Sequence, residues 1–435
     1  MTPTTQTHET AQSQERAILV GAPIKDVAAR EVEEHLEELT RLTDTAGAEV
    51  LGAVVQRLDA PHPKFFIGEG KVKQVKEMAE DRQADLIIFD EELSPAQARN
   101  LENELGIRVV DRTELILGIF AKRARTAEAQ MQVELAQLQY ALPRLKRMWT
   151  HLSRARGGVN MRGPGETQLE TDRRLVGVRI RDLKDKLEVV ARRRATQRKG
   201  RSDEFRVALV GYTNAGKSSI LRALSDSELF VEDRLFATLD PSTRAVELEG
   251  GLRALVTDTV GFIRKLPHAL VASFRATLEE ARDAELLLHV IDASHPMWEE
   301  HKEVVEAVLD DLELEDRPVV LVFNKSDRLT HDEEQALRQR ARAVYDQDVV
   351  LASAIEPGGL DELRERMRRE ASAQRPEVHL RVPAADGEAL ATIYREGEVL
   401  GTTQVDTTID VHARLPRAAL GRLSRRSGVE IVGAA

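Results

Sequence analysis

Apolar positions along the first hundred residues alternate between two spacings. Short stretches rich in apolar residues, each typical of a strand, occur at 17–20, 48–58, 85–89 and 107–110. Segments with apolar residues at helical spacing lie between them, at 27–42, 70–81 and 94–105. Strands that alternate with helices in this way predict a small parallel α/β domain over residues 16–111. The polar stretch 1–15 has no apolar core and predicts a disordered tail, neither a secretory signal nor a membrane anchor.

A helical hairpin is predicted next, over residues 112–201. The chain from Arg112 to about Leu145 contains few helix breakers, and a second helical pattern runs from about Gln168 to Gln197. A loop rich in Gly and Arg at 156–167 joins the two patterns, which indicates an antiparallel pair of helices. Apolar positions along the helices are interpreted as packing positions rather than as a cofactor site. In the second helix they are Leu175, Val178, Leu183, Leu187 and Val190.

The alternation of strands and helices returns after a polar hinge at 198–202. Strands are expected at 205–210, 245–249, 252–257, 285–291, 318–323 and 348–352. They predict an α/β domain over 202–374, with a mostly parallel, doubly wound sheet. Over 375–435 the order strand, helix, strand, strand, helix, strand predicts a small ferredoxin-like α+β domain.

The first apolar strand of the 202–374 domain leads into the sequence GYTNAGKS, and a helical pattern follows it. Strand, glycine turn and helix in this order are the context in which GxxxxGKS/T indicates a P loop. Backbone N–H groups of such a turn surround phosphate oxygens, Lys217 is expected to reach the β- and γ-phosphates, and the Ser218 hydroxyl to bind Mg²⁺. The nucleotide-binding residues predicted here are Gly211, Tyr212, Thr213, Asn214, Ala215, Gly216, Lys217, Ser218 and Ser219. A second glycine turn, GEGK at 68–71, has the wrong spacing and is interpreted as the opening of a helix.

The sequence NKSD at 324–327 follows another apolar strand and indicates which base is bound. The Asp327 carboxylate can accept hydrogen bonds from two N–H groups of guanine, whereas adenine offers no such pair. Asn324 is expected to hold the loop, and the stem of Lys325 to lie over the base. Ser353 and Ala354 end a later strand, where a backbone N–H is expected to contact guanine O6. These positions predict GTP and GDP rather than ATP.

Two segments between these motifs are expected to respond to the γ-phosphate. In the first, Thr238 is expected to close over Mg²⁺ and the γ-phosphate. In the second, Asp258 is expected to hold Mg²⁺ through water and the Gly261 N–H to contact the γ-phosphate. The predicted nucleotide contacts of the two segments are Phe236, Ala237, Thr238, Asp258, Thr259, Val260 and Gly261. The predicted metal ligands are Ser218 and Thr238, and the groups nearest the transferred phosphate are Lys217, Thr238 and Gly261.

Phe262 follows Gly261 at the position where many switch GTPases carry a Gln that orients the attacking water. A phenyl ring cannot hydrogen-bond water, so intrinsic hydrolysis is expected to be slow and to depend on other groups or on a partner. The alternative, that Phe262 only packs while another side chain orients the water, stays open at this point.

Composition narrows the possible partners. The chain has 435 residues, no Cys and 11 scattered His, which excludes disulfides and argues against a transition-metal site. No apolar run approaches the length of a membrane span, and a cytoplasmic protein is expected. Net charge is −11, yet residues 144–201 contain 18 Lys and Arg against 6 Asp and Glu.

A basic segment in an acidic chain favours contact with an anionic polymer such as RNA, although charge alone fits a solvated helix face equally well. The Gly- and Arg-rich loop suits phosphodiester contact better than a plain flexible linker does. The residues predicted to contact RNA are Arg154, Arg156, Gly157, Gly158, Arg162, Gly163, Gly165, Arg173 and Arg174.

From Arg16 onward the chain resembles the HflX family of ribosome-associated GTPases. The resemblance rests on GYTNAGKS at 211–218, FATLDP at 236–241, DTVGFI at 258–263 and, most specifically, RGPGETQLETDRR at 162–174. It implies a GTPase that binds the 50S ribosomal subunit in its GTP form and splits stalled or idle 70S ribosomes, with the subunit stimulating hydrolysis. It also implies that the N-terminal domain and the hairpin contact ribosomal RNA, and that a hydrophobic residue is usual at the position of Phe262.

Two other hypotheses stay open. One is an RNA-remodelling ATPase that grips RNA with the basic hairpin, against which Asn324 and Asp327 argue. The other is a nucleotide-gated repressor that occupies ribosomes and has little need for catalysis. The free protein is expected to be a monomer.

Overall fold

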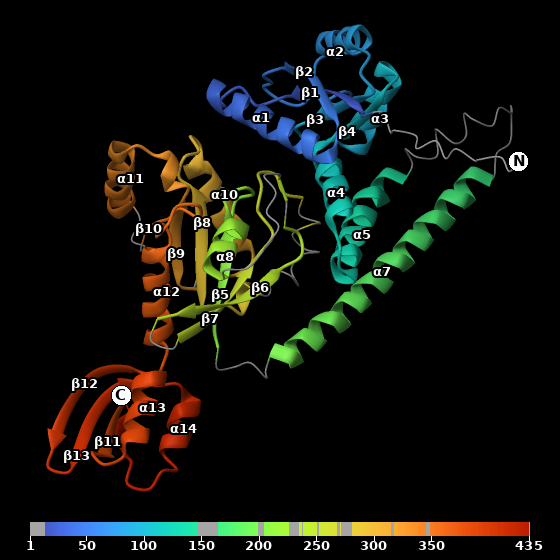
Figure 1. Ribbon diagram of the computed structural model, residues 1–435. Coiled ribbons are helices and arrows are strands. Elements are labelled where there is room, and N and C mark those ends of the chain that lie inside the picture. The colour runs from blue at the N-terminus through green and yellow to red at the C-terminus, as the bar shows by residue number, and fades with distance from the viewer. Residues whose placement is uncertain are drawn as a thin grey trace, which may run out of the picture. The chain divides into compact units, whose positions relative to one another are not determined.

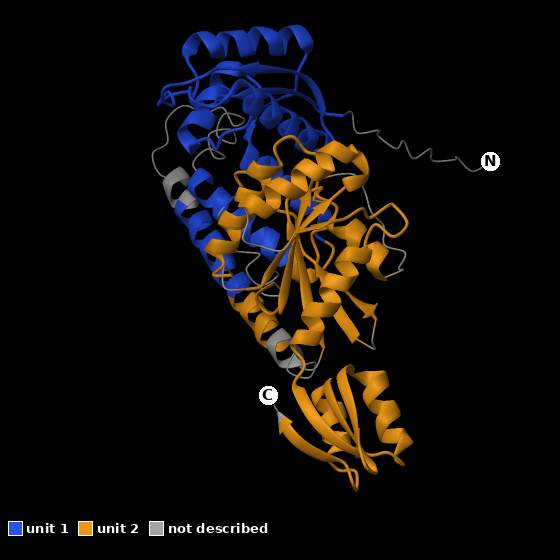
Figure 2. Ribbon diagram, turned by 90° about the vertical axis from the view of Figure 1, so that its left-hand side faces the viewer, with its two compact units in different colours: residues 1–124, 130–184, 267–270 blue, residues 125–129, 185–266, 271–435 orange. Residues whose placement is uncertain are grey.

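The computed structural model describes residues 14–145, 164–198, 204–225, 235–236, 238–249, 252–267, 270, 281–314, 317–344 and 349–434. The chain divides into two compact units, which Figure 2 shows in blue and orange. The first unit comprises 1–124, 130–184 and 267–270, and the second comprises 125–129, 185–266 and 271–435. No helix within the described ranges is both long enough and apolar enough to cross a membrane.

The N-terminal sheet of the first unit has four parallel strands in the order β2-β1-β3-β4 (Figure 1). The strands are β1 (Arg16–Gly21), β2 (Glu49–Val55), β3 (Leu86–Phe89) and β4 (Arg108–Asp111). The helices between them are α1 (Ala29–Ala46), α2 (Glu69–Arg82) and α3 (Pro95–Leu105). The predicted parallel α/β fold is confirmed, and Gly68 precedes the first residue of α2, as expected for a helix-opening turn.

The single helix predicted from Arg112 to about Leu145 is wrong, because the structure breaks it. α4 (Arg112–Arg123) ends at Ala124, whose backbone is extended with φ −63° and ψ 111°. α5 (Ala127–Ala141) follows, and the 3₁₀ turn η1 (Leu142–Arg144) continues it. The hydroxyl of Thr126 accepts a hydrogen bond from the Ala129 N–H at 3.1 Å, so Thr126 caps the new helix.

The second long helix of the predicted hairpin is α7 (Pro164–Arg198). Arg179 on α7 makes a two-pronged ion pair with Glu134 on α5, with N–O distances of 2.7 and 2.8 Å. Leu183 is fully buried, which confirms it as a packing position. Leu175 and Val178 are 58% and 48% exposed, so the prediction that they pack is wrong. A helical period identifies an apolar face but not whether a partner covers its whole length.

The larger sheet of the second unit has six strands in the order β10-β9-β8-β5-β7-β6 (Figure 1). The strands are β5 (Phe205–Gly211), β6 (Ser242–Leu248), β7 (Leu252–Asp258), β8 (Leu286–Asp292), β9 (Val319–Asn324) and β10 (Val349–Leu351). All neighbours are parallel except β6 and β7. The predicted P-loop GTPase architecture, a mostly parallel doubly wound sheet, is therefore confirmed.

Helices cover both faces of this sheet. On one face, α8 (Lys217–Ser225) and α12 (Asp361–Ala373) bury Ile220, Leu221, Leu363 and Met367 against the strands. On the other face, α11 (His331–Val344) buries Leu337 and Ala341, and α10 (Trp298–Asp311) packs Trp298 into the same cluster. The carboxyl ends of β5, β7, β8 and β9 then form one edge, where parallel α/β sheets bind ligands.

The C-terminal sheet is antiparallel in the order β12-β13-β11-β14, with helices between its strands. Its elements are β11 (Glu377–Pro383), α13 (Gly387–Glu396), β12 (Glu398–Val405), β13 (Thr408–Arg414), α14 (Arg417–Leu423) and β14 (Glu430–Ala434). This order of strands and helices confirms the predicted ferredoxin-like fold.

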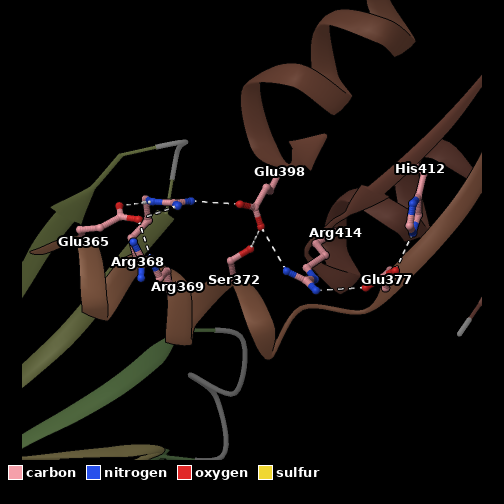
Figure 3. Close-up of polar contacts among 8 residues, drawn as sticks. All are labelled: Glu365, Arg368, Arg369, Ser372, Glu377, Glu398, His412 and Arg414. Atoms are coloured by element: carbon pink, nitrogen blue, oxygen red, sulfur yellow. Dashed lines mark hydrogen bonds and ion pairs between the residues drawn. The ribbon is translucent and has the colours of Figure 1, made fainter. Parts of the chain in front are cut away.

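An ionic network joins α12 to the C-terminal sheet. Figure 3 shows Glu398 between Arg368 and Ser372 of α12 and Arg414 of β13. Arg368 donates to Glu398 at 3.1 Å, and Arg414 pairs with Glu377 at 3.2 Å. One turn earlier on α12, Arg364 donates to the carbonyls of Ala223 and Leu224 at the end of α8, at 3.2 and 3.1 Å. A single helix thus contacts both the P-loop helix and the C-terminal sheet.

Candidate functional site

The glycine turn between β5 and α8 has the backbone conformation of an anion-binding loop. Gly216 has φ +97°, and a side chain there would collide with the Asn324 amide. Gly211 is equally restricted, because a Cβ would collide with the carbonyl oxygen of Val290. Both positions therefore require glycine.

Lys217, the first residue of α8, lies over this turn with only 6% of its surface exposed. Its ammonium donates to the carbonyls of Gly211 and Tyr212 at 3.0 and 2.9 Å. Burial lowers the pKa of Lys217 to about 8, and the nearby Asp258 carboxylate opposes that shift. A buried cation at the start of a helix favours an anionic ligand, because a phosphate would restore the charge balance.

Three oxygen donors meet next to the start of α8. The Ser218 hydroxyl lies 2.7 Å from the Thr238 hydroxyl and donates to the Asp258 carboxylate at 2.6 Å. The other carboxylate oxygen of Asp258 is buried and has no hydrogen-bond partner among the residues that the structure describes. Burial raises the pKa of Asp258, with Lys217, Ser218 and Thr238 opposing it. Two hydroxyls and a carboxylate with a spare oxygen suit a hard cation such as Mg²⁺.

The segment after Asp258 is bound to the P loop by main-chain hydrogen bonds. The Phe262 N–H donates to the Gly211 carbonyl at 3.1 Å, and the Thr213 N–H donates to the Phe262 carbonyl at 2.7 Å. The Arg264 N–H donates to the Tyr212 hydroxyl at 2.9 Å. Gly261 sits between the Thr213 backbone and Lys217 Nζ, where a Cβ would crowd both. The backbone at 261–264 is thus positioned by the P loop itself.

The Phe262 side chain is fully buried. It therefore packs in the interior, as both interpretations of this position allow. The orienting group for the attacking water must then come from another part of the protein or from a partner, and slow intrinsic hydrolysis stays a prediction.

The loops after β9 and β10 are bonded to each other and to the P loop. Asn324 donates to the Ala215 carbonyl at 2.8 Å, so it holds the end of β9 to the P loop. The Ser353 hydroxyl donates to Asp327 at 2.6 Å and accepts from the N–H groups of Ile355 and Glu356. These contacts fix the half-buried Asp327 carboxylate in the loop after β9, the residue predicted to bind the base.

A residue that the sequence motifs did not single out, Asp292 at the end of β8, holds Lys325. The Lys325 ammonium lies 2.7 Å from the Asp292 carboxylate, and Lys325 itself adopts φ +63°. Burial raises the pKa of Asp292, but hydrogen bonds from Lys325 and Ser294 outweigh it, so the net pKa is below the usual value. The sequence signal that could have identified Asp292 is its position at the end of a buried strand, because the carboxyl ends of parallel strands bind ligands.

The remaining predicted site residues belong to the first unit or lie outside the described residues. Ala237 lies outside the described residues, and so do Arg154, Arg156, Gly157, Gly158, Arg162 and Gly163. Gly165 falls in the first turn of α7, and Arg173 and Arg174 are exposed farther along the same helix. The structure therefore gathers the predicted nucleotide-binding residues but does not test the predicted RNA contacts.

Comparisons with known proteins agree with this geometry. Residues 33–121 match a family model described as GTP-binding GTPase N-terminal, residues 123–201 match one described as GTP-binding GTPase middle region, and residues 206–325 match one described as 50S ribosome-binding GTPase. GTPase HflX of Magnetococcus marinus is 45% identical over 429 residues, 97% of this chain and 98% of that protein. GTPase HflX of Escherichia coli is 42% identical over 399 residues, 90% and 92% of the two chains.

Solved structures include a GTP-binding protein from Sulfolobus solfataricus in complex with GDP. That protein is 26% identical, the match covers 83% of this chain and 99% of that one, and the TM-score is 0.44.

Proposed function

The chain belongs to the GTPase HflX family and hydrolyses GTP to GDP and phosphate, and from this premise we propose that it acts on the ribosome. In the proposal it binds the 50S subunit in its GTP form and splits stalled or idle 70S ribosomes under stress. Its place of action is then the cytoplasm, and the free protein is a monomer.

The proposed roles at the site follow from the contacts. Lys217 and the turn N–H groups bind the phosphates, and Asp327 with Ser353 binds the guanine edge. Ser218 and Thr238 would hold Mg²⁺ by their hydroxyls, with Asp258 acting through water. The bound ion would neutralise charge on the phosphate oxygens. The Gly261 N–H would contact the γ-phosphate.

One observation carries the ribosomal part of the proposal, namely the match of residues 206–325 to the family model described as 50S ribosome-binding GTPase. Charge supports it, because residues 144–201 combine 18 Lys and Arg with only 6 Asp and Glu. Phe262 supports it as well, because a GTPase without a water-orienting side chain at that position depends on a partner for fast turnover.

The direct test is a GTPase assay with and without isolated 50S subunits. We expect the subunits to raise turnover by at least about tenfold, as a stimulating partner does. Replacing both Arg173 and Arg174 with Ala should weaken that stimulation. The matched control replaces Arg192 and Arg193, two exposed arginines near the other end of α7, and should not weaken it. Turnover that is unchanged by 50S subunits would refute the proposal.

Splitting is tested by sedimenting 70S ribosomes with the protein and GTP, a non-hydrolysable GTP analogue or GDP. The proposal requires subunits to appear with GTP or the analogue and not with GDP. Binding to 70S ribosomes without any splitting would instead support a nucleotide-gated repressor.

A further inference from the structure

Asp240 accepts a set of hydrogen bonds from the two residues that precede α5, far away in sequence. Its carboxylate accepts from the Arg125 N–H at 3.2 Å and from the Thr126 N–H at 3.3 Å. It also accepts from the Thr126 hydroxyl. Residues 125–129 and 240 belong to the same compact unit. One carboxylate therefore binds three donors at the start of a helix, where negative charge is favourable.

The break in the helix explains why those donors are available. Ala124 is extended, so the N–H groups of Arg125 and Thr126 have no helical partner. Thr126 connects Asp240 to the first turn of α5, because its hydroxyl donates to Asp240 and accepts from the Ala129 N–H at 3.1 Å. Asp240 thus completes the cap of α5, and α5 continues from residue 130 into the first unit.

Asp240 also lies two residues after Thr238, in the segment expected to respond to the γ-phosphate. In the structure the Thr238 hydroxyl points to the metal-site oxygens, 2.7 Å from Ser218. The inward position of Thr238 and the contact of Asp240 with α5 therefore occur together. With one residue between them, a large movement of Thr238 must also move Asp240.

We propose that Asp240 is a positioning residue that couples the nucleotide-dependent position of Thr238 to the first turn of α5. The proposal rests on the assignment of Thr238 to the metal and γ-phosphate given above. With GTP bound, Thr238 lies inward and Asp240 caps α5. After loss of the γ-phosphate the segment opens and the cap is released. Because coupling is reciprocal, anything that displaces the start of α5 also weakens the binding of GTP relative to GDP.

The first test follows hydrogen–deuterium exchange of a peptide covering 121–132 in the full-length protein. The Arg125 and Thr126 amides should exchange more slowly with a non-hydrolysable GTP analogue than with GDP. The difference should disappear in Asp240→Ala. Equal exchange in the two nucleotide states of the unaltered protein would overturn the proposal.

The second test compares affinities for the GTP analogue and for GDP in variants. Asp240→Ala should lower affinity for the analogue by about fivefold, the typical effect of a helix cap, and change GDP affinity less. Thr126→Val should act in the same direction, whereas Thr126→Ser keeps the hydroxyl and should behave like the unaltered protein. Asp406→Asn, at an exposed position in the turn between β12 and β13, is the control.

The double variant Asp240→Ala/Thr126→Val separates coupling from two independent effects. Coupling requires the double variant to lose no more than the larger single loss. Losses that simply add would overturn it. If Asp240→Ala does not fold, the Thr126→Val and Thr126→Ser pair still decides the question. Failure of the proposed role of Thr238 is distinguishable, because the unaltered protein would then show no preference for Mg²⁺-bound GTP analogue over the metal-free form.

Discussion

The N-terminal sheet and the larger sheet of the second unit both carry acidic or amide side chains at the ends of strands. The hydrogen-bond partners of these side chains differ between the two sheets. In the N-terminal sheet, Asp90 follows β3 and accepts from the buried Arg112 at 2.9 Å. Asp111 ends β4 and accepts from the N–H groups of Leu93 and Glu114 at 3.1 and 2.9 Å. Protein donors thus occupy these carboxylates, which fix loops and the start of α4.

In the larger sheet of the second unit, Asp258 and Asn324 end β7 and β9, and each keeps a buried side-chain oxygen without a partner among the described residues. A buried polar atom without a partner costs free energy unless a ligand or water completes it. An unpartnered buried oxygen therefore distinguishes the strand ends predicted to bind nucleotide, whereas acidic or amide side chains occur at the strand ends of both sheets.

The largest effect is expected in the N-terminal sheet, where protein donors bind the carboxylates, when one of those donors is removed. Arg112→Met leaves Glu38 and Asp90 buried without their cation. The free energy of opening the N-terminal sheet should fall by about 3–5 kcal/mol, as measured by hydrogen exchange of β1 and β3. GTP hydrolysis should be unaffected. Arg30→Met, at an exposed position on α1, is the control and should change the opening free energy by less than about 0.5 kcal/mol.

Asp258→Asn tests the larger sheet, where a buried carboxylate oxygen has no partner among the described residues. It should lower GTP turnover by at least about 100-fold, because metal binding contributes several kcal/mol to such reactions. Thermal stability should stay the same or rise, since burial already disfavours the charged form of Asp258. Asp90→Asn, the same change at a strand end of the other sheet, should lower stability and spare turnover. An Asp258→Asn protein that is active but unstable would contradict the comparison.

The pH dependence of nucleotide binding gives a smaller, graded effect. Burial lowers the pKa of Lys217 to about 8 in the protein without nucleotide. Above that pH the ammonium loses its proton, whereas bound phosphate favours the charged form. Affinity for GDP should therefore fall by up to about tenfold for each pH unit above 8. Isothermal titration should also show proton uptake on binding, and constant affinity from pH 7 to 9.5 would contradict the assignment.

The smallest effect is expected at Asp292, which holds Lys325, the residue predicted to lie over the guanine base. Asp292→Asn keeps a hydrogen-bond acceptor for Lys325 but removes the charge, so GDP affinity should fall by about fivefold, or about 1 kcal/mol. Competition with a fluorescent GDP derivative measures this change. Asp310→Asn, at an exposed position on α10, is the control. Identical affinity in the two variants would show that Asp292 does not position Lys325.

Sequence periodicity and motifs predicted all three sheets and the residues that gather at the nucleotide-binding edge, because both depend on short stretches of chain. Contacts between distant residues could not be predicted in this way. The cap at the break before α5 comes from Asp240, which lies 114 residues from Thr126. The support of Lys325 by Asp292 spans 33 residues. The exposure of Leu175 and Val178 depends on which part of α7 another element covers, and helical spacing carries no such information.

The network at Glu398 has a practical consequence for following the protein in solution. Because Arg368 and Ser372 on α12 bind Glu398 of the C-terminal sheet, that sheet is held to the helix that also contacts the end of α8. A fluorophore attached to the C-terminal sheet should therefore report the slow rotation of the whole GTPase domain rather than rapid local tumbling. The absence of Cys in the sequence allows such a label to be placed at one engineered thiol. Fluorescence anisotropy from that label would register the arrival of a particle as large as a ribosomal subunit.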